Sequence, residues 1–238
     1  MHEVKTVTKK LFWDRPYDRE FEAKVVSVDG QRVILDQTLF YPRGGGVASD
    51  TGLLDNAKVV EVTKQNDQIW HSLGSIAGFK PGESVRGSVD WERRHRLMRM
   101  HTAGHLLSSI FYRENCLITG NQIDPDRSRF DFNLEQFDRA RIEGFVNEAN
   151  RIIAKDAPVK MYFVDRDEAL KMPGLVKLAQ AAPPTEDQLR IVEIEGIDRQ
   201  ADGGLHVANL TEIGRIELLK LENKGKNNRR LYYDVKNL

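Results

Sequence analysis

The chain has few of the features that mark secreted, membrane-spanning or disordered proteins. Its 238 residues include a single cysteine, Cys116, so no intramolecular disulfide can form. The amino-terminal segment has no apolar run that could serve as a signal peptide, and no stretch approaches the roughly 18 apolar residues of a membrane span. We therefore expect a soluble, cytoplasmic protein without a membrane partner.

An excess of charge of one sign is also missing. The 36 Lys and Arg residues balance 36 Asp and Glu residues, which argues against indiscriminate binding to polyanions but allows a local basic face. Positive charge concentrates in two segments, and such runs are typical both of phosphate contacts and of ordinary solvated faces. The candidate phosphate contacts among them are Arg93, Arg94, Arg96 and Arg99 in the first segment and Lys224, Lys226, Arg229 and Arg230 in the second.

Two motifs that are common in hydrolases and nucleotide-binding proteins are absent. Thr102 follows His101 where HExxH zinc proteases carry glutamate, which argues against a thermolysin-like protease. The run Gly44, Gly45, Gly46 is neither a Walker A loop nor a GxGxxG fingerprint. On composition alone a structural loop is the favoured interpretation, and the alternative is a backbone that holds a phosphate or carbonyl oxygen.

Three histidines and one aspartate have the spacing of a metal site. His101 and His105 are four residues apart, and four residues on a helix return to the same face. Asp202 and His206 are also four apart, and the glycines between them allow a tight loop to turn both side chains toward one point. Together these groups would nearly complete a tetrahedral zinc shell. The alternative is an ordinary helical histidine pair and an ordinary Asp-Gly-Gly turn.

The pattern of apolar residues changes near residue 90. Alternating segments at 21–28, 31–36, 57–63 and 84–89 predict the strands of a small barrel or curled sheet. Helices are predicted from an N-cap at Asp90 to about residue 115 and over 138–155, both with apolar residues at helical spacing. Further strands are expected at 128–132, 159–164, 190–194 and 213–220, with a short helix near 167 that ends at Pro173-Gly174.

These elements predict an α+β fold with two domains. Residues 1–90 would form an N-terminal β-barrel with the glycine-rich loop. Residues 91–238 would form a metal-binding α/β core with helices on one face of a mainly antiparallel sheet.

Five stretches, in order along the chain, resemble the freestanding alanyl-tRNA editing proteins of the AlaX type, relatives of the editing domain of alanyl-tRNA synthetase. They are FYPRGGGVASDTG at 40–52, RMHTAGHLL at 99–107, PDRSRFDF at 125–132, ADGGLHVANLTEIG at 201–214 and ENKGKNNRRLY at 222–232. The glycine-rich amino-terminal portion is similar to the medium-length class, which carries a small β-barrel before the editing core. The resemblance implies one Zn²⁺ per chain on His101, His105 and His206. Asp202 stands where many relatives have cysteine, so either its carboxylate or a water would be the fourth ligand.

The same resemblance implies a trans-editing aminoacyl-tRNA deacylase that hydrolyses the ester of mischarged Ser-tRNA(Ala), with Gly-tRNA(Ala) as a second candidate. Its partner would be the acceptor end of tRNA(Ala), and the candidate phosphate contacts of the two basic segments would bind this tRNA. The sequence predicts nothing about oligomeric state. The three histidines are the predicted catalytic residues, and the sequence offers no obvious separate general base. A site that selects serine must bind its hydroxyl. The predicted substrate contacts are Thr102, Thr119, Asn121, Gln122 and the glycines at 44–46.

Two other functions stay open at this point. One is a non-catalytic tRNA- or RNA-binding module in which the metal is structural or absent. The other is a metallohydrolase that acts on a different substrate, such as another misacylated tRNA.

Overall fold

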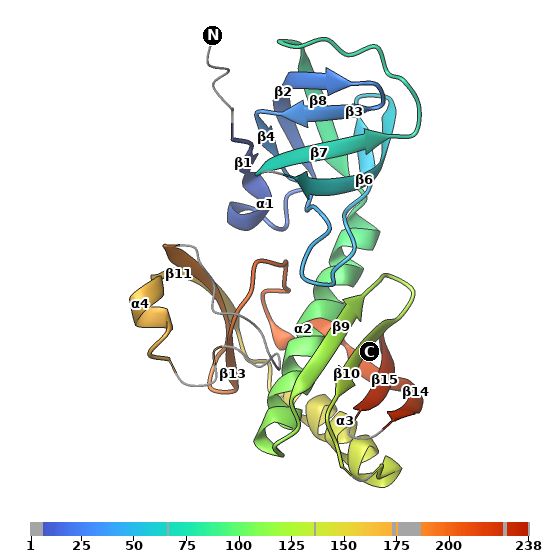
Figure 1. Ribbon diagram of the computed structural model, residues 1–238, viewed down its shortest axis with the longest axis vertical. Helices are drawn as coiled ribbons and strands as arrows, with labels where there is room; N and C mark the ends of the chain where they lie inside the picture. The colour runs from blue at the N-terminus through green and yellow to red at the C-terminus, as the bar shows by residue number, and fades with distance from the viewer. Residues whose placement is uncertain are drawn as a thin grey trace. The chain divides into compact units, whose positions relative to one another are not determined.

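The computed structural model describes residues 7–65, 67–135, 137–172, 175, 187–225 and 228–237. The chain divides into two compact units, residues 1–96 and 97–238 (Figure 1). The division falls inside the long helix α2 (Trp91–Arg113), whereas the change in sequence pattern places the boundary just before this helix. Within the described part of the chain, no helix is both long and apolar enough to cross a lipid bilayer.

Among the described residues of the first unit, six strands pair in a closed ring, in the order β2-β3-β7-β6-β5-β8. Every pairing in this ring is antiparallel. The strands are β2 (Glu20–Asp29), β3 (Arg32–Leu35), β5 (Gly52–Leu54), β6 (Ala57–Gln65), β7 (Gln68–Leu73) and β8 (Ser84–Val89). Alternate residues of β2, namely Phe21, Ala23 and Val25, are buried, as the alternating sequence predicts. Outside the ring, β1 (Lys9–Lys10) pairs in parallel with β4 (Gln37–Thr38), and α1 (Leu11–Asp14) follows β1.

Helix α2 begins and ends close to the predicted positions. The Asp90 carboxylate accepts a hydrogen bond from the backbone N–H of Arg93 at 3.2 Å and caps the amino terminus. At the other end Asn115 adopts a φ of 60°, and the backbone N–H of Cys116 donates to the Phe111 carbonyl at 2.9 Å. This combination is a Schellman ending, in which a left-handed residue terminates the helix.

In the part of the second unit that the structure describes, there are two antiparallel sheets where the sequence analysis predicts one. A four-stranded sheet has the order β14-β15-β10-β9, and a three-stranded sheet has the order β11-β12-β13. The strands are β9 (Ile118–Ile123), β10 (Ser128–Phe132), β11 (Val159–Asp165), β12 (Gln188–Ile194), β13 (Asp198–Ala201), β14 (Arg215–Gly225) and β15 (Asn228–Lys236). The helices are α3 (Arg139–Ile153), α4 (Arg166–Ala169) and the 3₁₀ turn η1 (Leu210–Ile213).

The α+β class and the mainly antiparallel pairing are confirmed, and the single sheet is a wrong prediction. Strands β11 to β13 form a separate sheet because they bury their own small apolar cluster together with α4. That cluster consists of Ala169, Leu175, Leu189 and Ile191. The strand predicted from residue 213 begins only at Arg215, because η1 takes up the preceding turn. The Pro173-Gly174 helix end lies outside the described residues.

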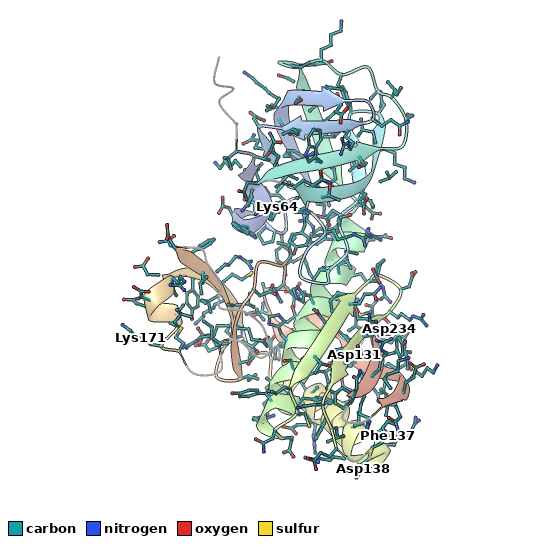
Figure 2. The ribbon with its side chains drawn as sticks, viewed as in Figure 1. Lys64, Asp131, Phe137, Asp138, Lys171 and Asp234 are labelled. Atoms are coloured by element: carbon teal, nitrogen blue, oxygen red, sulfur yellow. The ribbon has the colours of Figure 1, made fainter. Side chains whose placement is uncertain are left out.

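Helices α2 and α3 cover the same face of the four-stranded sheet. Phe111 of α2 packs against Phe130 and Phe132 of β10 and against Phe145 of α3, with ring centroids 4.7 to 5.1 Å apart. Asp138 caps α3 by accepting a hydrogen bond from a backbone N–H in its first turn (labelled in Figure 2). The apolar side of α2 is therefore fixed against the sheet.

Candidate metal centre

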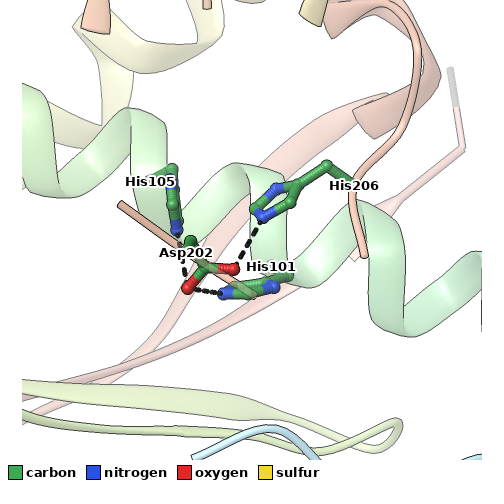
Figure 3. A group of neighbouring side chains, drawn as sticks. All are labelled: His101, His105, Asp202 and His206. Atoms are coloured by element: carbon green, nitrogen blue, oxygen red, sulfur yellow. Dashed lines mark hydrogen bonds and ion pairs between the residues drawn. The ribbon is translucent and has the colours of Figure 1, made fainter. Parts of the chain in front are cut away.

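Four polar side chains from two distant segments converge in the second unit (Figure 3). His101 and His105 lie one turn apart on α2, while Asp202 and His206 come from the loop between β13 and η1. The ligand atoms that these residues can offer all lie within 4.8 Å of one another. The tertiary structure thus brings together the four residues that the spacing singles out.

Asp202 is the residue that the three histidines share. Its Oδ2 lies 3.6 Å from His101 Nε2 and 3.7 Å from His105 Nε2, and its Oδ1 lies 3.3 Å from His206 Nε2. The first two distances are too long for hydrogen bonds. They are near the separation of about 3.3–3.4 Å that a tetrahedral shell with metal–ligand bonds of about 2.0–2.1 Å gives to neighbouring ligand atoms. The spacing therefore fits ligands placed around a shared ion.

The protonation of the cluster also suits a cation. Burial lowers the pKa of His101 to about 4 and holds the pKa of His206 well below its ordinary value. Burial acts to raise the pKa of Asp202, but the facing imidazoles outweigh it and hold that pKa well below its ordinary value. At neutral pH the imidazoles of His101 and His206 are thus neutral and the Asp202 carboxylate is anionic, which is the ligand state that metal binding requires.

Access to the cluster is from the side of Asp202. The histidine side chains are 0 to 9% exposed, whereas the Asp202 side chain is 22% exposed. A donor set of three imidazoles and one carboxylate is suited to zinc, and three protein ligands with a water in the fourth position is the usual arrangement of catalytic zinc. The residues present therefore fit a divalent metal ion.

The loop that carries Asp202 and His206 is held by two features. Gly204 approaches α2 so closely that an added Cβ would lie 2.4 Å from His101 Cε1 and 2.8 Å from Asp202 Oδ1. The buried Arg190 of β12 donates from Nη1 to the Asp202 carbonyl at 3.0 Å and to the Gly204 carbonyl at 2.7 Å. The pattern of the sequence predicts Arg190 only as part of a strand, although a cation next to the apolar run at 191–192 is a signal for a buried polar contact.

Thr102, a predicted substrate contact, is occupied by contacts within the protein. Thr102 is fully buried on α2, and its Oγ1 lies 3.0 Å from the Met98 carbonyl and 3.1 Å from His206 Nδ1. The backbone N–H of Val207 donates to the same oxygen at 3.2 Å. A hydroxyl with these partners has no capacity left for a ligand.

The three predicted contacts on β9 do not share one side of the sheet. Asn121 pairs with the buried Phe130 and is half-buried on the face that α2 covers. Gln122 is exposed on the opposite face, where its amide binds Asp124 and accepts from Arg129. Thr119 is exposed and lies at the bulge in the pairing of β9 with β10. Of the three, the structure turns Asn121 toward the metal helix.

The predicted glycine loop is a tight turn in the first unit. The backbones of Gly44 and Val47 exchange hydrogen bonds at 3.2 and 2.8 Å. Gly45 and Gly46 between them have φ values of 58° and 82°. Positive φ at both central residues is the signature of a type I′ turn, which explains two of the glycines without a ligand. Gly45 and Gly46 are nevertheless exposed.

Two arginines of the first basic segment are structural. Arg94 is 1% exposed and donates to the Asp50 carboxylate and to the carbonyls of Leu39 and Pro16. Arg99 is 8% exposed and binds the carbonyls of Ile213 and Lys236. Both guanidinium groups, which the charge pattern predicts as phosphate contacts, are thus buried among internal acceptors. Arg93 and Arg96 are half-buried.

The second basic segment is also largely committed to internal contacts. Arg229 is buried and donates to the carbonyls of Gly225 and Glu135. Arg230 pairs with both oxygens of Asp131 (labelled in Figure 2), and this hydrogen bonding raises the pKa of Arg230. Lys224 is exposed and pairs with Glu222 at 3.4 Å. Lys226 lies outside the described residues.

Arg230 also projects away from the metal helix. Residues alternate between the two faces of a strand, and Tyr233 of β15 donates its hydroxyl to the Met100 carbonyl of α2. Arg230 is an odd number of residues from Tyr233 along β15, so its side chain lies on the opposite face of the sheet from Tyr233. Arg230, a predicted tRNA contact, therefore lies on the face of the sheet that α2 does not cover.

Comparison with known proteins relates both units of the chain to tRNA synthetase families. The family described as "Threonyl and Alanyl tRNA synthetase second additional domain" matches residues 189–232, which include Asp202 and His206. The family described as "tRNA synthetases class II (A)" matches residues 3–93 in the first unit. The chain is 49% identical over 237 residues to the alanyl-tRNA editing protein AlaX-M of Saccharolobus solfataricus, with 97% of this chain and 100% of that protein covered.

The chain belongs to the AlaX-M family of alanyl-tRNA editing proteins. Its similarity to the AlaX-M protein of Methanosarcina barkeri is 44% identity, with 96% of this chain and 99% of that protein covered. It is also 38% identical to an alanine–tRNA ligase of Methanococcus maripaludis, over 96% of this chain but only 26% of the ligase. The AlaX-M chain thus corresponds to a part of that larger enzyme, as the resemblance of its five motifs implies.

Proposed function

We propose that this AlaX-M chain is a trans-editing aminoacyl-tRNA deacylase. It hydrolyses the ester that joins a wrong amino acid, serine first and glycine second, to the acceptor end of tRNA(Ala). The observation that carries the proposal is the cluster of His101, His105, Asp202 and His206, partly open to solvent, in a chain of this family.

The cluster would hold one Zn²⁺ per chain. His101, His105 and His206 would bind through Nε2, and Asp202 would contribute a carboxylate oxygen on the exposed side. A bound Zn²⁺ supplies Lewis acidity toward an ester carbonyl or an attacking water. The chain itself keeps His101 and His206 neutral by burial and excludes water from the side opposite Asp202.

Serine must be distinguished from alanine by its hydroxyl. A pocket that fits alanine rejects an added hydroxyl by only about 10²-fold, so an editing site gains selectivity by binding that hydroxyl. We assign Asn121 this role, because it is the predicted contact that lies on the α2 side of the sheet. The exposed turn at Gly45 and Gly46 stays a proposed contact to substrate, and Arg93, Arg96 and Lys224 stay proposed contacts to tRNA phosphates.

Deacylation of Ser-tRNA(Ala) tests the proposal directly. We expect the metal-loaded chain to hydrolyse this substrate and to spare Ala-tRNA(Ala). Chelation should abolish turnover and added Zn²⁺ should restore it. His105→Ala should lose activity at least 100-fold, since one of three imidazole ligands is removed. Arg113→Ala, at an exposed position on the same helix, is the matched control and should keep full activity.

The other functions give different results in the same experiment. A non-catalytic binding module would bind tRNA without turnover, whether or not it contained zinc. A hydrolase with another substrate would release a different amino acid when a panel of charged tRNAs is tested. Retained hydrolysis of Ser-tRNA(Ala) by metal-free His105→Ala would refute the metal-dependent scheme.

A further inference from the structure

The hydroxyl of Thr102 connects the two segments that form the metal cluster. Thr102 lies between the two histidines of α2 and is fully buried. Its Oγ1 lies 3.0 Å from the Met98 carbonyl oxygen, 3.2 Å from the Val207 backbone nitrogen and 3.1 Å from His206 Nδ1. The first two partners belong to the helix and to the loop, and the third is the imidazole that the loop contributes.

The hydrogens of these contacts can be assigned from chemistry alone. A hydroxyl has one hydrogen to donate and two lone pairs to accept with. The Met98 carbonyl can only accept, so it takes the hydroxyl hydrogen, as is common for threonine one turn along a helix. The Val207 N–H can only donate, so it occupies one lone pair. The remaining lone pair faces His206 Nδ1, which must therefore carry a hydrogen.

A neutral imidazole has one hydrogen, so the other ring nitrogen of His206 is then bare. That atom, Nε2, is the one directed at the cluster, 3.3 Å from Asp202 Oδ1. Two lone pairs facing each other at this distance repel, and a cation bound by both removes the repulsion.

We propose that Thr102 is a positioning residue that holds His206 in the Nδ1–H tautomer and thereby presents a bare Nε2 to the metal. The inference rests on the proposed metal function for its consequence, but the tautomer can be measured without metal. Without the hydroxyl, His206 can place its hydrogen on Nε2 and donate it to Asp202, which satisfies both groups and competes with the ion.

The test uses the full chain and three variants. Thr102→Val keeps the shape but removes the hydroxyl, and Thr102→Ser keeps the hydroxyl. Ser109→Ala is the matched control, since it removes another buried hydroxyl of α2 that bonds only a helix carbonyl, that of Leu106 at 2.8 Å, among the contacts described. The affinity for Zn²⁺ is measured by competition with a chromophoric chelator. The tautomer of His206 is read from ¹⁵N chemical shifts of the metal-free wild-type chain.

We expect Thr102→Val to weaken Zn²⁺ binding by about 10–100-fold, which is the usual effect of removing a group that orients a metal ligand. Thr102→Ser and Ser109→Ala should stay within about threefold of the wild type, well below that usual effect. The ¹⁵N shifts should show hydrogen on Nδ1.

Two results would overturn the inference. One is a folded Thr102→Val variant with a lower melting temperature but unchanged Zn²⁺ affinity, which would indicate a purely structural hydroxyl. The other is hydrogen on Nε2 in the wild-type chain, and this measurement decides the matter even if Thr102→Val does not fold. Failure of the wild-type chain to bind Zn²⁺ would instead count against the proposed function, and the tautomer would still be decided by the shifts.

Discussion

Replacing Gly204 with alanine is expected to damage the metal cluster through a single added methyl group. The new Cβ would lie 2.4 Å from His101 Cε1, 2.6 Å from His101 Nδ1 and 2.8 Å from Asp202 Oδ1. Ordinary contacts of a Cβ atom begin at 3.4 Å, so the imidazole or the loop must move by about 1 Å to restore one. Metal–ligand distances tolerate only about 0.2 Å. The substitution therefore separates His101 and Asp202 from a common ion.

The magnitude follows from this displacement. Forcing an extra group into a packed interior costs about 1–3 kcal/mol of folding free energy. Disturbing a group that only supports a metal ligand lowers metal affinity by about 10–100-fold. Here two proposed ligands are displaced, so the Zn²⁺ affinity should fall by at least this much. The Zn²⁺ affinity and the urea unfolding midpoint, each measured on the same preparation, check both effects.

Gly144→Ala is the matched control. Gly144 lies in α3, and a Cβ there would meet nothing within 4 Å. Alanine at an interior helix position should stabilise the chain by about 0.5–1 kcal/mol. It should leave the Zn²⁺ affinity unchanged. Wild-type Zn²⁺ affinity in Gly204→Ala would refute the reasoning, because it would mean that the loop does not lie against His101 as described.

Two further predictions concern the first unit. His71 is fully buried against the Thr38 hydroxyl, and burial lowers the pKa of His71 from 6.5 to about 4. Above pH 6.5 the ring is neutral in both the folded and the unfolded state. Between about pH 6.5 and 4 only the unfolded chain gains the proton. The free energy of unfolding therefore decreases as the pH is lowered, by up to about 1.4 kcal/mol per pH unit and by about 3 kcal/mol in total. Urea unfolding at pH 7.5, 6 and 5 should show a shallower loss for His71→Gln, and equal slopes would contradict the prediction. Arg94 and Asp50 form an ion pair with side chains only 1 and 2% exposed. Arg94→Met should therefore cost about 3–5 kcal/mol by leaving a buried carboxylate unpaired; a loss below about 1 kcal/mol, the range of exposed pairs, would show that Asp50 is solvated instead.

Local patterns predicted the helices well, and they singled out the four residues that the structure brings together. The N-cap at Asp90, the strand at 84–89 and the apolar side of α2 depend on neighbours within a few residues, and the structure has each of them. The spacing of His101 and His105 places both on one helix face by geometry alone. Charge runs were a poorer guide, because sequence does not distinguish a solvated arginine from one that bonds internal carbonyls, as Arg94, Arg99 and Arg229 do.

Composition and short-range spacing are enough to predict which residues form α2 and which four side chains have ligand chemistry. Only the folded chain shows that residues 202–206 meet residues 101–105, that the Thr102 hydroxyl lies beside His206, and that the second unit has separate sheets in its described part. These outcomes depend on contacts between segments about a hundred residues apart. Such contacts are set by packing and hydrogen-bond partners that no local pattern encodes.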